Sequence, residues 1–283
     1  MKTSLPTGIS FKGQHLPQIL ADRPGVGFFE AHPENYFVDG GPRHIALTRL
    51  REHYPLSLHG VSLSLAGAAP VDDAHLRRLK HLIQRYEPLF VSDHLAWCKA
   101  AGDYLPDLLP VPLNEVVLAH VCDNVRRTQD ALGRQIFIEN PSSYLAFSQT
   151  DMTEPEFLQA VVAASGCKLL LDLNNIYVSG ENIGFDANAY VDAIPGDMIG
   201  EVHLAGHCVD TAAPERILID DHGSTVAAPV WALLARLCER VGPKPTLVEW
   251  DTNVPELGVL VAEADKANDV RSSQSALDLG EVG

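Results

Sequence analysis

The chain has 283 residues, of which 46% are hydrophobic and 20% are charged, so it carries enough apolar material for a large folded core. Its 37 acidic residues outnumber its 21 basic ones, which gives a formal net charge of −16 at pH 7. This balance argues against nucleic acid as a partner, because polyanion-binding proteins concentrate positive charge. The apolar runs are strand-sized, far short of the roughly 20 residues that cross a bilayer. With no membrane span and no apolar signal core at the start, we expect a cytoplasmic protein.

Short β-rich runs alternate with longer helical patterns along almost the whole sequence. Strands are predicted at residues 7–10, 26–31, 55–60, 89–94, 135–140, 168–173, 199–204 and 246–250. Helices are predicted at residues 14–21, 43–53, 72–86, 113–131, 154–164, 186–193, 228–241 and 256–267. The segments 95–112 and 205–226 are expected to be long loops.

Repeated β-then-α units favour a parallel sheet, because parallel strands need helical crossovers. Eight such units predict an α/β fold of the (β/α)8 TIM-barrel type, with a doubly wound sheet as the alternative. We expect one catalytic domain over residues 1–270 and a disordered tail over residues 271–283.

Almost every predicted strand ends in a carboxylate, imidazole or carboxamide side chain. These residues are Glu30, His32, Glu34, Asn35, His59, Asp93, His94, Glu139, Asn140, Asp172, Asn174, Asn175, His203, His207, Glu249 and Asp251, with Asp220 and His222 in an extended segment before the last strand. A single polar residue at a strand end is ordinarily a hydrogen-bonded core residue or a helix cap. In a closed barrel, however, the strand ends converge on one pocket, where unpaired carboxylates would repel. The pattern therefore predicts a cation among them.

The mixture of imidazole and carboxylate groups is typical of iron, manganese or zinc sites. It contains too many groups for one catalytic ion, which takes about three protein ligands. We therefore expect two or three ions with a bridging carboxylate, for which Glu139 is the candidate.

The five cysteines are widely spaced and form no CxxC pair, so neither a disulfide framework nor a thiolate metal site is expected. Cys98 and Cys208 lie in the expected loops and are interpreted as ordinary thiols rather than redox-active groups. Basic residues follow one face of the helix at 72–86, which is interpreted as a solvated face, with partner docking as the alternative.

Seven ordered motifs resemble one known family. They are SLHGVSLSL, VSDHLAW, ENPSSY, LDLNNIYVSG, EVHLAGH, DDHG and LVEWDTNVP. Over about residues 7–268 the chain is similar to the multinuclear non-haem iron-dependent oxidative enzymes, the family of the methanobactin-biosynthesis iron oxygenase. The resemblance implies a xylose-isomerase-like TIM barrel.

The resemblance also implies a set of iron ligands in this sequence. They are His59, His94, Glu139, Asp172, Asn175, His203, Asp220, His222 and Glu249. Glu139, Asp172 and His203 are also expected to take part in catalysis. Asp220 fits the family's Asp-x-His pattern better than Asp221, and His207 is either a further ligand or a residue that supports one. The segment from Glu30 to Asn35 is expected to support ligands or to contact the peptide.

The implied activity is oxidation by dioxygen at two or three irons in mixed Fe(II) and Fe(III) states. The implied substrate is a cysteine-containing, ribosomally made precursor peptide, which a small partner protein helps to present. The alternatives are a divalent-metal sugar isomerase or epimerase on the same barrel, an endonuclease-IV-like phosphodiesterase, which the net charge disfavours, and a metal-binding protein without catalysis.

Overall fold

The computed structural model describes residues 6–100, 103–212 and 216–277. Within these residues, eight strands pair in the order β1-β12-β9-β8-β7-β4-β3-β2 and form a closed barrel. The strands are β1 (Gly8–Ser10), β2 (Phe29–Ala31), β3 (Leu56–Gly60), β4 (Phe90–His94), β7 (Phe137–Glu139), β8 (Lys168–Asp172), β9 (Ile199–Leu204) and β12 (Thr246–Val248). The predicted TIM barrel is thereby confirmed, and the doubly wound sheet is excluded.

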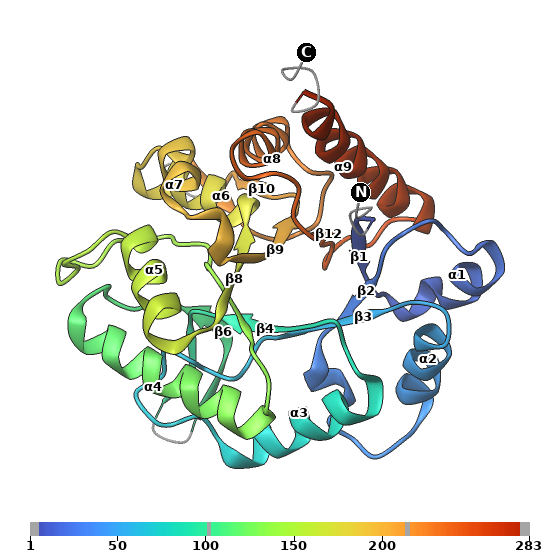
Figure 1. Cartoon of the computed structure of the whole chain (residues 1–283), viewed down its shortest axis with the longest axis horizontal. Coiled ribbons are helices and arrows are strands. Elements are labelled where there is room, and N and C mark those ends of the chain that lie inside the picture. Colours follow the sequence, from blue (N-terminus) through green and yellow to red (C-terminus); the bar gives the residue numbers. More distant parts are fainter. Residues whose placement is uncertain (1–5, 101–102, 213–215, 278–283) are drawn as a thin grey trace. The chain divides into compact units, whose positions relative to one another are not determined.

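Helices connect successive barrel strands (Figure 1). The α-helices are α1 (Leu16–Asp22), α2 (Pro42–Arg51), α3 (Asp73–Tyr86), α4 (Glu115–Leu132), α5 (Glu154–Ser165), α6 (Leu173–Ile183), α7 (Ala187–Ala193), α8 (Ala228–Val241) and α9 (Leu257–Leu277). Short 3-10 turns cover η1 (Gly13–His15), η2 (Pro33–Tyr36) and η3 (Gly196–Met198). In the part of the chain that the structure describes, no helix has the length and apolar character of a membrane span.

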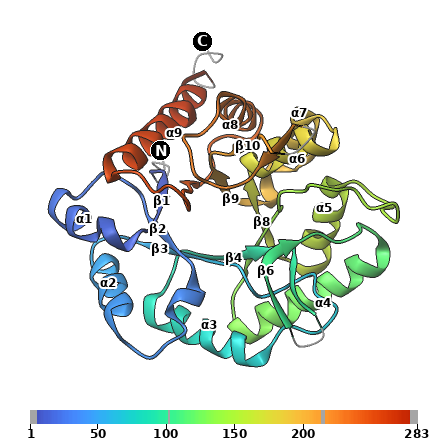
Figure 2. The same ribbon diagram turned by 180° about the vertical axis from the view of Figure 1, so that it is seen from behind.

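The chain divides into two compact units, which are Met1–Glu30, Ser142–Tyr144 and Leu171–Gly283 for the first, and Ala31–Pro141 and Leu145–Leu170 for the second. In the first unit, β12 pairs in parallel with both β1 and β9, and α8 packs beside α9 (Figure 1). In the second unit, β4 pairs in parallel with both β3 and β7, and α3 packs beside α4 (Figure 2).

Local sequence explains where several helices begin and end. The side chain of Asp72 accepts a hydrogen bond at the start of α3, and Asn114 does the same for α4. Thr153 and Glu156 form a capping box at the start of α5, and Gly166 ends that helix with a φ of 72°. These caps fix the lengths of the helices and therefore the points at which the chain re-enters the barrel.

Helix α6 was missed by the sequence prediction, which continued the strand to residue 173 and placed the next helix at 186–193. The structure begins α6 at Leu173, directly after β8. Asp172 caps it, because its Oδ1 accepts a 2.6 Å hydrogen bond from the backbone N–H of Asn175. The apolar side chains of Leu173 and Ile176, three residues apart, with Gly184 after the last turn, are the helix signal that the continuous apolar run concealed.

The end of α9 also differs from the prediction, which ended the helix at 267 and began a disordered tail at 271. The helix continues to Leu277, so this prediction was wrong for residues 271–277, and residues 278–283 lie outside the described part. Arg271 is buried and donates to the Thr7 hydroxyl at 3.0 Å, which ties the last turns of the helix to the start of β1. A buried arginine with such a partner cannot be recognised from composition.

Each segment that was expected to be a loop contains a two-stranded antiparallel sheet. In the second unit, β5 (Trp97–Ala100) pairs with β6 (Asp103–Leu109). In the first unit, β10 (Cys208–Asp210) pairs with β11 (Ile217–Ile219). The second hairpin delivers the segment that carries Asp220 and His222.

Candidate metal centre

Three buried side chains converge at the carboxyl ends of neighbouring strands in the second unit. His59 comes from β3, His94 from β4 and Glu139 from β7. Glu139 Oε2 lies 2.9 Å from His59 Nε2 and 3.1 Å from His94 Nε2, and the two Nε2 atoms are 3.3 Å apart. The three residues are 1%, 7% and 1% exposed, so water does not screen this contact. The three-residue group has the composition and spacing of a metal site.

Contacts at the Nδ1 atom of each imidazole orient the ring so that Nε2 faces the carboxylate of Glu139. His94 Nδ1 lies 3.1 Å from the carbonyl oxygen of Gly60, and His59 Nδ1 lies 2.8 Å from the hydroxyl of Ser92. A carbonyl oxygen accepts only, so His94 Nδ1 carries a proton, and in the neutral ring Nε2 presents a lone pair. Two imidazolium rings at this separation would repel each other, whereas one metal ion would satisfy both nitrogens and the carboxylate. The residues therefore fit a cation.

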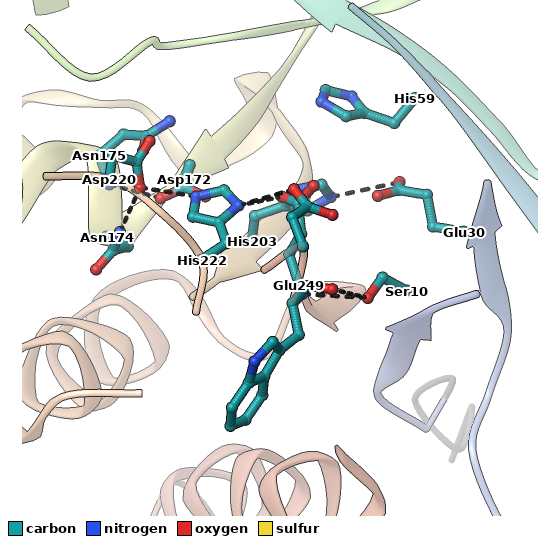
Figure 3. A network of polar contacts seen from close by, with 12 residues as sticks. Ser10, Glu30, His59, Asp172, Asn174, Asn175, His203, Asp220, His222 and Glu249 are labelled. Atoms are coloured by element: carbon teal, nitrogen blue, oxygen red, sulfur yellow. Dashed lines mark hydrogen bonds and ion pairs between the residues drawn. The ribbon is translucent and has the colours of Figure 1, made fainter. Parts of the chain in front are cut away.

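A second cluster lies in the first unit, around His203 at the end of β9 (Figure 3). His203 Nδ1 is 3.2 Å from Glu249 Oε2, and His203 Nε2 is 3.4 Å from Glu30 Oε2. All three residues are at most 3% exposed. Burial lowers the pKa of His203, but the charge of Glu30 and the hydrogen bonds to Glu249 and Glu30 outweigh it and raise the pKa well above its usual value. Two buried carboxylates thus demand positive charge at this point, which either a proton or a metal ion supplies.

His222 extends this cluster, because Asp172, His222 and Glu249 form a further candidate ligand group. His222 Nδ1 lies 3.4 Å from Glu249 Oε2, and His222 Nε2 lies 2.7 Å from Asp220 Oδ1. Burial lowers the pKa of His222, but the charges of Asp220 and Glu249 outweigh burial, so the pKa lies well above its usual value. This balance repeats the one at His203.

The backbone at His222 is in the left-handed region, with a φ of 45°. This conformation is uncommon for residues other than glycine, and such strain gathers at functional sites. The carbonyl of His222 accepts a 2.8 Å hydrogen bond from the N–H of Asp251, which holds the segment beside the end of β12. A Cβ at the next residue, Gly223, would lie 2.4 Å from Thr252 Oγ1, so a side chain there would displace this segment.

The contacts around Asp220 bear on two questions that the sequence left open, the choice between Asp220 and Asp221 and the role of His207. Asp220, rather than Asp221, faces His222 in the structure. Asn174 Nδ2 donates to Asp220 Oδ1 at 2.7 Å (Figure 3). His207 Nδ1 lies 2.8 Å from Asn174 Oδ1. His207 therefore supports Asp220 through Asn174. Burial lowers the pKa of His207, which favours the neutral ring in this role.

The structure distributes the nine predicted ligands between the two units. His59, His94 and Glu139 lie in the second unit, and Asp172, Asn175, His203, Asp220, His222 and Glu249 lie in the first. Asn175 is buried in the first turn of α6, and its N–H, donated to Asp172, fixes that carboxylate.

Glu30 belongs to a candidate ligand group although the sequence expectation gave it a supporting role. Its signal was a carboxylate next to the apolar pair Phe28 and Phe29, where packing alone would place an apolar residue.

The segment after β2 supports the second-unit cluster from outside. His32 Nδ1 lies 3.1 Å from the carbonyl oxygen of His59. Glu34 Oε1 accepts hydrogen bonds from the N–H of Val61 and the hydroxyl of Ser62, each at 3.0 Å. These contacts fix the chain on both sides of Gly60 and so the direction in which His59 leaves its strand.

Among the residues that the structure describes, the candidate ligand groups offer nitrogen and oxygen atoms only. Cys98, Cys122, Cys167 and Cys238 are buried, and burial raises the pKa of the Cys167 and Cys238 thiols to about 11. Cys208 is exposed on β10. Such thiols stay protonated near neutral pH, so the set suits iron, manganese or zinc bound by imidazole and carboxylate.

Solved structures with the same architecture include magnesium-bound and sugar-epimerising barrels. A xylose isomerase-like TIM barrel protein from Mycobacterium smegmatis in complex with magnesium gives a TM-score of 0.61 at 12% identity, covering 95% of this chain and 97% of that one. A D-psicose 3-epimerase with D-tagatose from Clostridium cellulolyticum H10 gives 0.58 at 13% identity, covering 95% and 98%. At these identities the likeness establishes the fold, which is that of a xylose-isomerase-like TIM barrel.

Closer relatives share the sequence along almost its full length. A UPF0276 protein of Paraburkholderia phytofirmans is 47% identical over 274 residues, which are 96% of this chain and 89% of that protein. Residues 6–272 match the family described as “RiPP precursor modification enzyme MbnB/TglH/ChrH”. The matched residues include both His–carboxylate clusters and the segment with Asp220 and His222. The chain therefore belongs to the MbnB/TglH/ChrH family of RiPP precursor modification enzymes.

Proposed function

We propose that the protein is a multinuclear iron-dependent, dioxygen-using enzyme that modifies cysteine residues of a ribosomally synthesised precursor peptide. The observation that carries this proposal is the pair of buried His–carboxylate clusters in a chain of this family. Neither an isolated buried carboxylate nor a lone histidine would require metal. The Nε2 atoms of His59 and His94 and the Oε2 atom of Glu139 lie within 3.3 Å of one another, and this convergence favours a bound metal ion.

The choice of iron rests on the seven motifs that resemble the multinuclear iron enzymes, since the donor set also suits manganese and zinc. His59, His94 and Glu139 would hold one ion. His203, Glu249, Asp172 and His222, with Glu30, Asp220 and Asn175 beside them, would hold one or two more. When bound in mixed Fe(II) and Fe(III) states, the iron supplies redox chemistry with dioxygen and an open position for a cysteine thiolate.

The residues of the chain supply orientation and charge. Ser92 and the Gly60 carbonyl keep the Nε2 atoms of His59 and His94 directed at Glu139, which raises their strength as ligands. Glu139, Asp172 and His203 are the residues we assign to catalysis as well as to ligation. Their burial excludes water, which strengthens every electrostatic contact with a bound thiolate.

The proposal includes a small partner protein that helps to present the peptide to the enzyme. This partner is inferred from the family resemblance, and the test is to add it to an assay that contains the iron-loaded enzyme, the precursor peptide and dioxygen. An increase in the turnover of the peptide without a change in metal content would support a presenting role.

The direct test is oxygen uptake by anaerobically purified, iron-loaded protein mixed with the cysteine-bearing peptide encoded beside its gene. We expect oxygen consumption and a mass change confined to a cysteine-containing fragment, and neither with the Cys→Ser peptide. A divalent-metal sugar epimerase would instead convert a ketohexose without oxygen, and a metal-binding protein without catalysis would leave both substrates unchanged. Either of these results would refute the proposal.

A further inference from the structure

A groove of about 390 Å³ lies in the second unit, between the segment after η2 and helix α3. Phe37 and Val38 form one side, and Arg77, Arg78, His81 and Arg85 line the side formed by α3. None of these residues belongs to a candidate ligand group. The groove is thus a separate feature from the metal centre.

The groove concentrates positive charge in a chain whose net charge is −16. Within the described ranges, no carboxylate lies in ion-pair distance of Arg77, Arg78 or Arg85, and Asp39 is the one acidic residue in the lining. The neighbouring helix differs, since Arg126 and Arg127 of α4 pair with carboxylates at 3.0 and 2.7 Å. The three guanidinium groups of α3 are therefore available to an external carboxylate.

Aromatic rings support two of these guanidinium groups. Arg78 lies over the ring of Phe37 at 5.0 Å, and Arg85 lies over the ring of Tyr86 at 5.2 Å. Stacking restricts the side chains and lowers the entropy lost when they bind a carboxylate. Val38 is 61% exposed at the rim and offers an apolar contact beside the charges. The surface suits an acidic peptide that also carries an apolar side chain.

The groove is continuous with the segment that supports the second-unit cluster. Phe37 and Val38 directly follow η2, whose Glu34 binds the backbone after His59. A peptide lying over this segment would have one part near the His59 strand end and another in the groove. We propose that the groove docks an acidic segment of the precursor peptide that flanks the modified cysteine. This inference rests on the proposed function for the identity of the peptide.

The test uses a fluorescein-labelled synthetic peptide, Glu-Glu-Leu-Glu-Glu-Leu-Glu-Glu, and its counterpart with Gln at every Glu position. Fluorescence anisotropy with the full-length protein at low salt should show binding of the Glu peptide at least tenfold tighter than that of the Gln peptide. The double variant Arg78→Gln/Arg85→Gln should lose at least fivefold in affinity. Each exposed bidentate contact contributes modestly, so two are removed together.

The control variant is Lys80→Gln, on the same helix but outside the groove lining. Its amine donates to the Ala131 carbonyl, and we expect wild-type affinity after its removal. Equal binding of the two peptides, or unchanged affinity of the double variant, would overturn the inference.

A third arm separates this inference from the proposed function. Binding of the Glu peptide should persist after metal chelation, because the groove contains none of the candidate ligands. If the oxygen-uptake test fails while the double variant still weakens Glu-peptide binding, the proposed chemistry is wrong and the groove remains an acidic-peptide site. If modification proceeds and the double variant leaves the KM for the precursor peptide unchanged, the groove assignment is wrong.

Discussion

His94 is held between Gly60 and Glu139, with its Nδ1 3.1 Å from the Gly60 carbonyl oxygen and its Nε2 3.1 Å from Glu139 Oε2. The strand pairing produces this geometry, because His94 is the partner of Glu139 in the register of β4 and β7. Gly60 also lies opposite Asp93 in the register of β3 and β4. The glycine is thus in contact with both residues that end β4.

Replacement of Gly60 by alanine should displace this arrangement. A Cβ at residue 60 would lie 2.3 Å from Asp93 Oδ2, and that carboxylate is held by the N–H groups of Leu63 and His94. We expect Gly60→Ala to reduce bound metal by at least one ion and to cost about 1–3 kcal/mol in unfolding free energy. Gly13→Ala is the control, since its Cβ would meet nothing within 4 Å. Full metal content in Gly60→Ala would contradict the prediction.

The hydroxyl of Ser92 should matter for metal affinity although it is not a ligand. It lies 2.8 Å from His59 Nδ1, and this hydrogen bond orients the ring. Loss of such a contact weakens metal binding about 10–100-fold, so Ser92→Ala should show this loss in a competition titration with a chelator. Ser57 on β3 is an equally buried serine whose hydroxyl has no partner among the described residues. Ser57→Ala should therefore bind metal like the wild type, and equal affinities of all three proteins would refute the orienting role.

The chain from His207 through Asn174 should control Asp220. Asn174→Leu removes the 2.7 Å hydrogen bond to Asp220 and leaves that carboxylate free to turn. We expect a lower metal affinity for the first-unit cluster and no change at His59 and His94. His207→Gln, which retains a donor toward Asn174, should lie near the wild type, whereas His207→Phe should resemble Asn174→Leu. Isothermal titration of the metal-free variants measures this order, and an equal effect of Gln and Phe would contradict it.

His75 of α3 should make the protein less stable in acid. Burial is the main cause that lowers its pKa to about 4, opposed by the charge of Glu34 and assisted by Lys99 and Arg78. Between about pH 6.5 and 4 the unfolded chain therefore binds a proton at His75, whereas the folded chain does not. The unfolding free energy is accordingly highest above this window and decreases as the pH falls through it. Between pH 7 and 5 the loss should be about 2 kcal/mol in unfolding free energy. Urea unfolding of metal-free wild type and His75→Gln measures it, and identical pH slopes would show that His75 is not responsible.

The barrel strands were predictable because their apolar cores and terminal polar residues are both encoded locally. The strand at residues 199–204 and the helix at 228–241 agree with β9 and α8 at both ends. Helix α6 was not predictable from periodicity alone, because Asp172 is at once the last residue of β8 and the cap of the helix. An immediate strand-to-helix transition leaves no turn residues for the sequence to display.

The candidate site was predictable by residue type but not by contact. Histidines and carboxylates at strand ends indicated a metal centre, yet the role of His207 required the position of Asn174, which depends on α6. Glu30 shows the same limit. Its carboxylate meets His203 from a strand far away in the sequence, and the pairing of β1 with β2 and β12, and of β12 with β9, brings those segments together.

Whether these clusters hold iron is decided by metal analysis of the anaerobically purified protein. The measurement is iron, manganese and zinc per chain, made on the wild type and on Glu139→Gln as the matched variant. We expect two or three irons per chain in the wild type and a loss of at least one in the variant. Fewer than two irons in the wild type, or an unchanged iron content in Glu139→Gln, would contradict it.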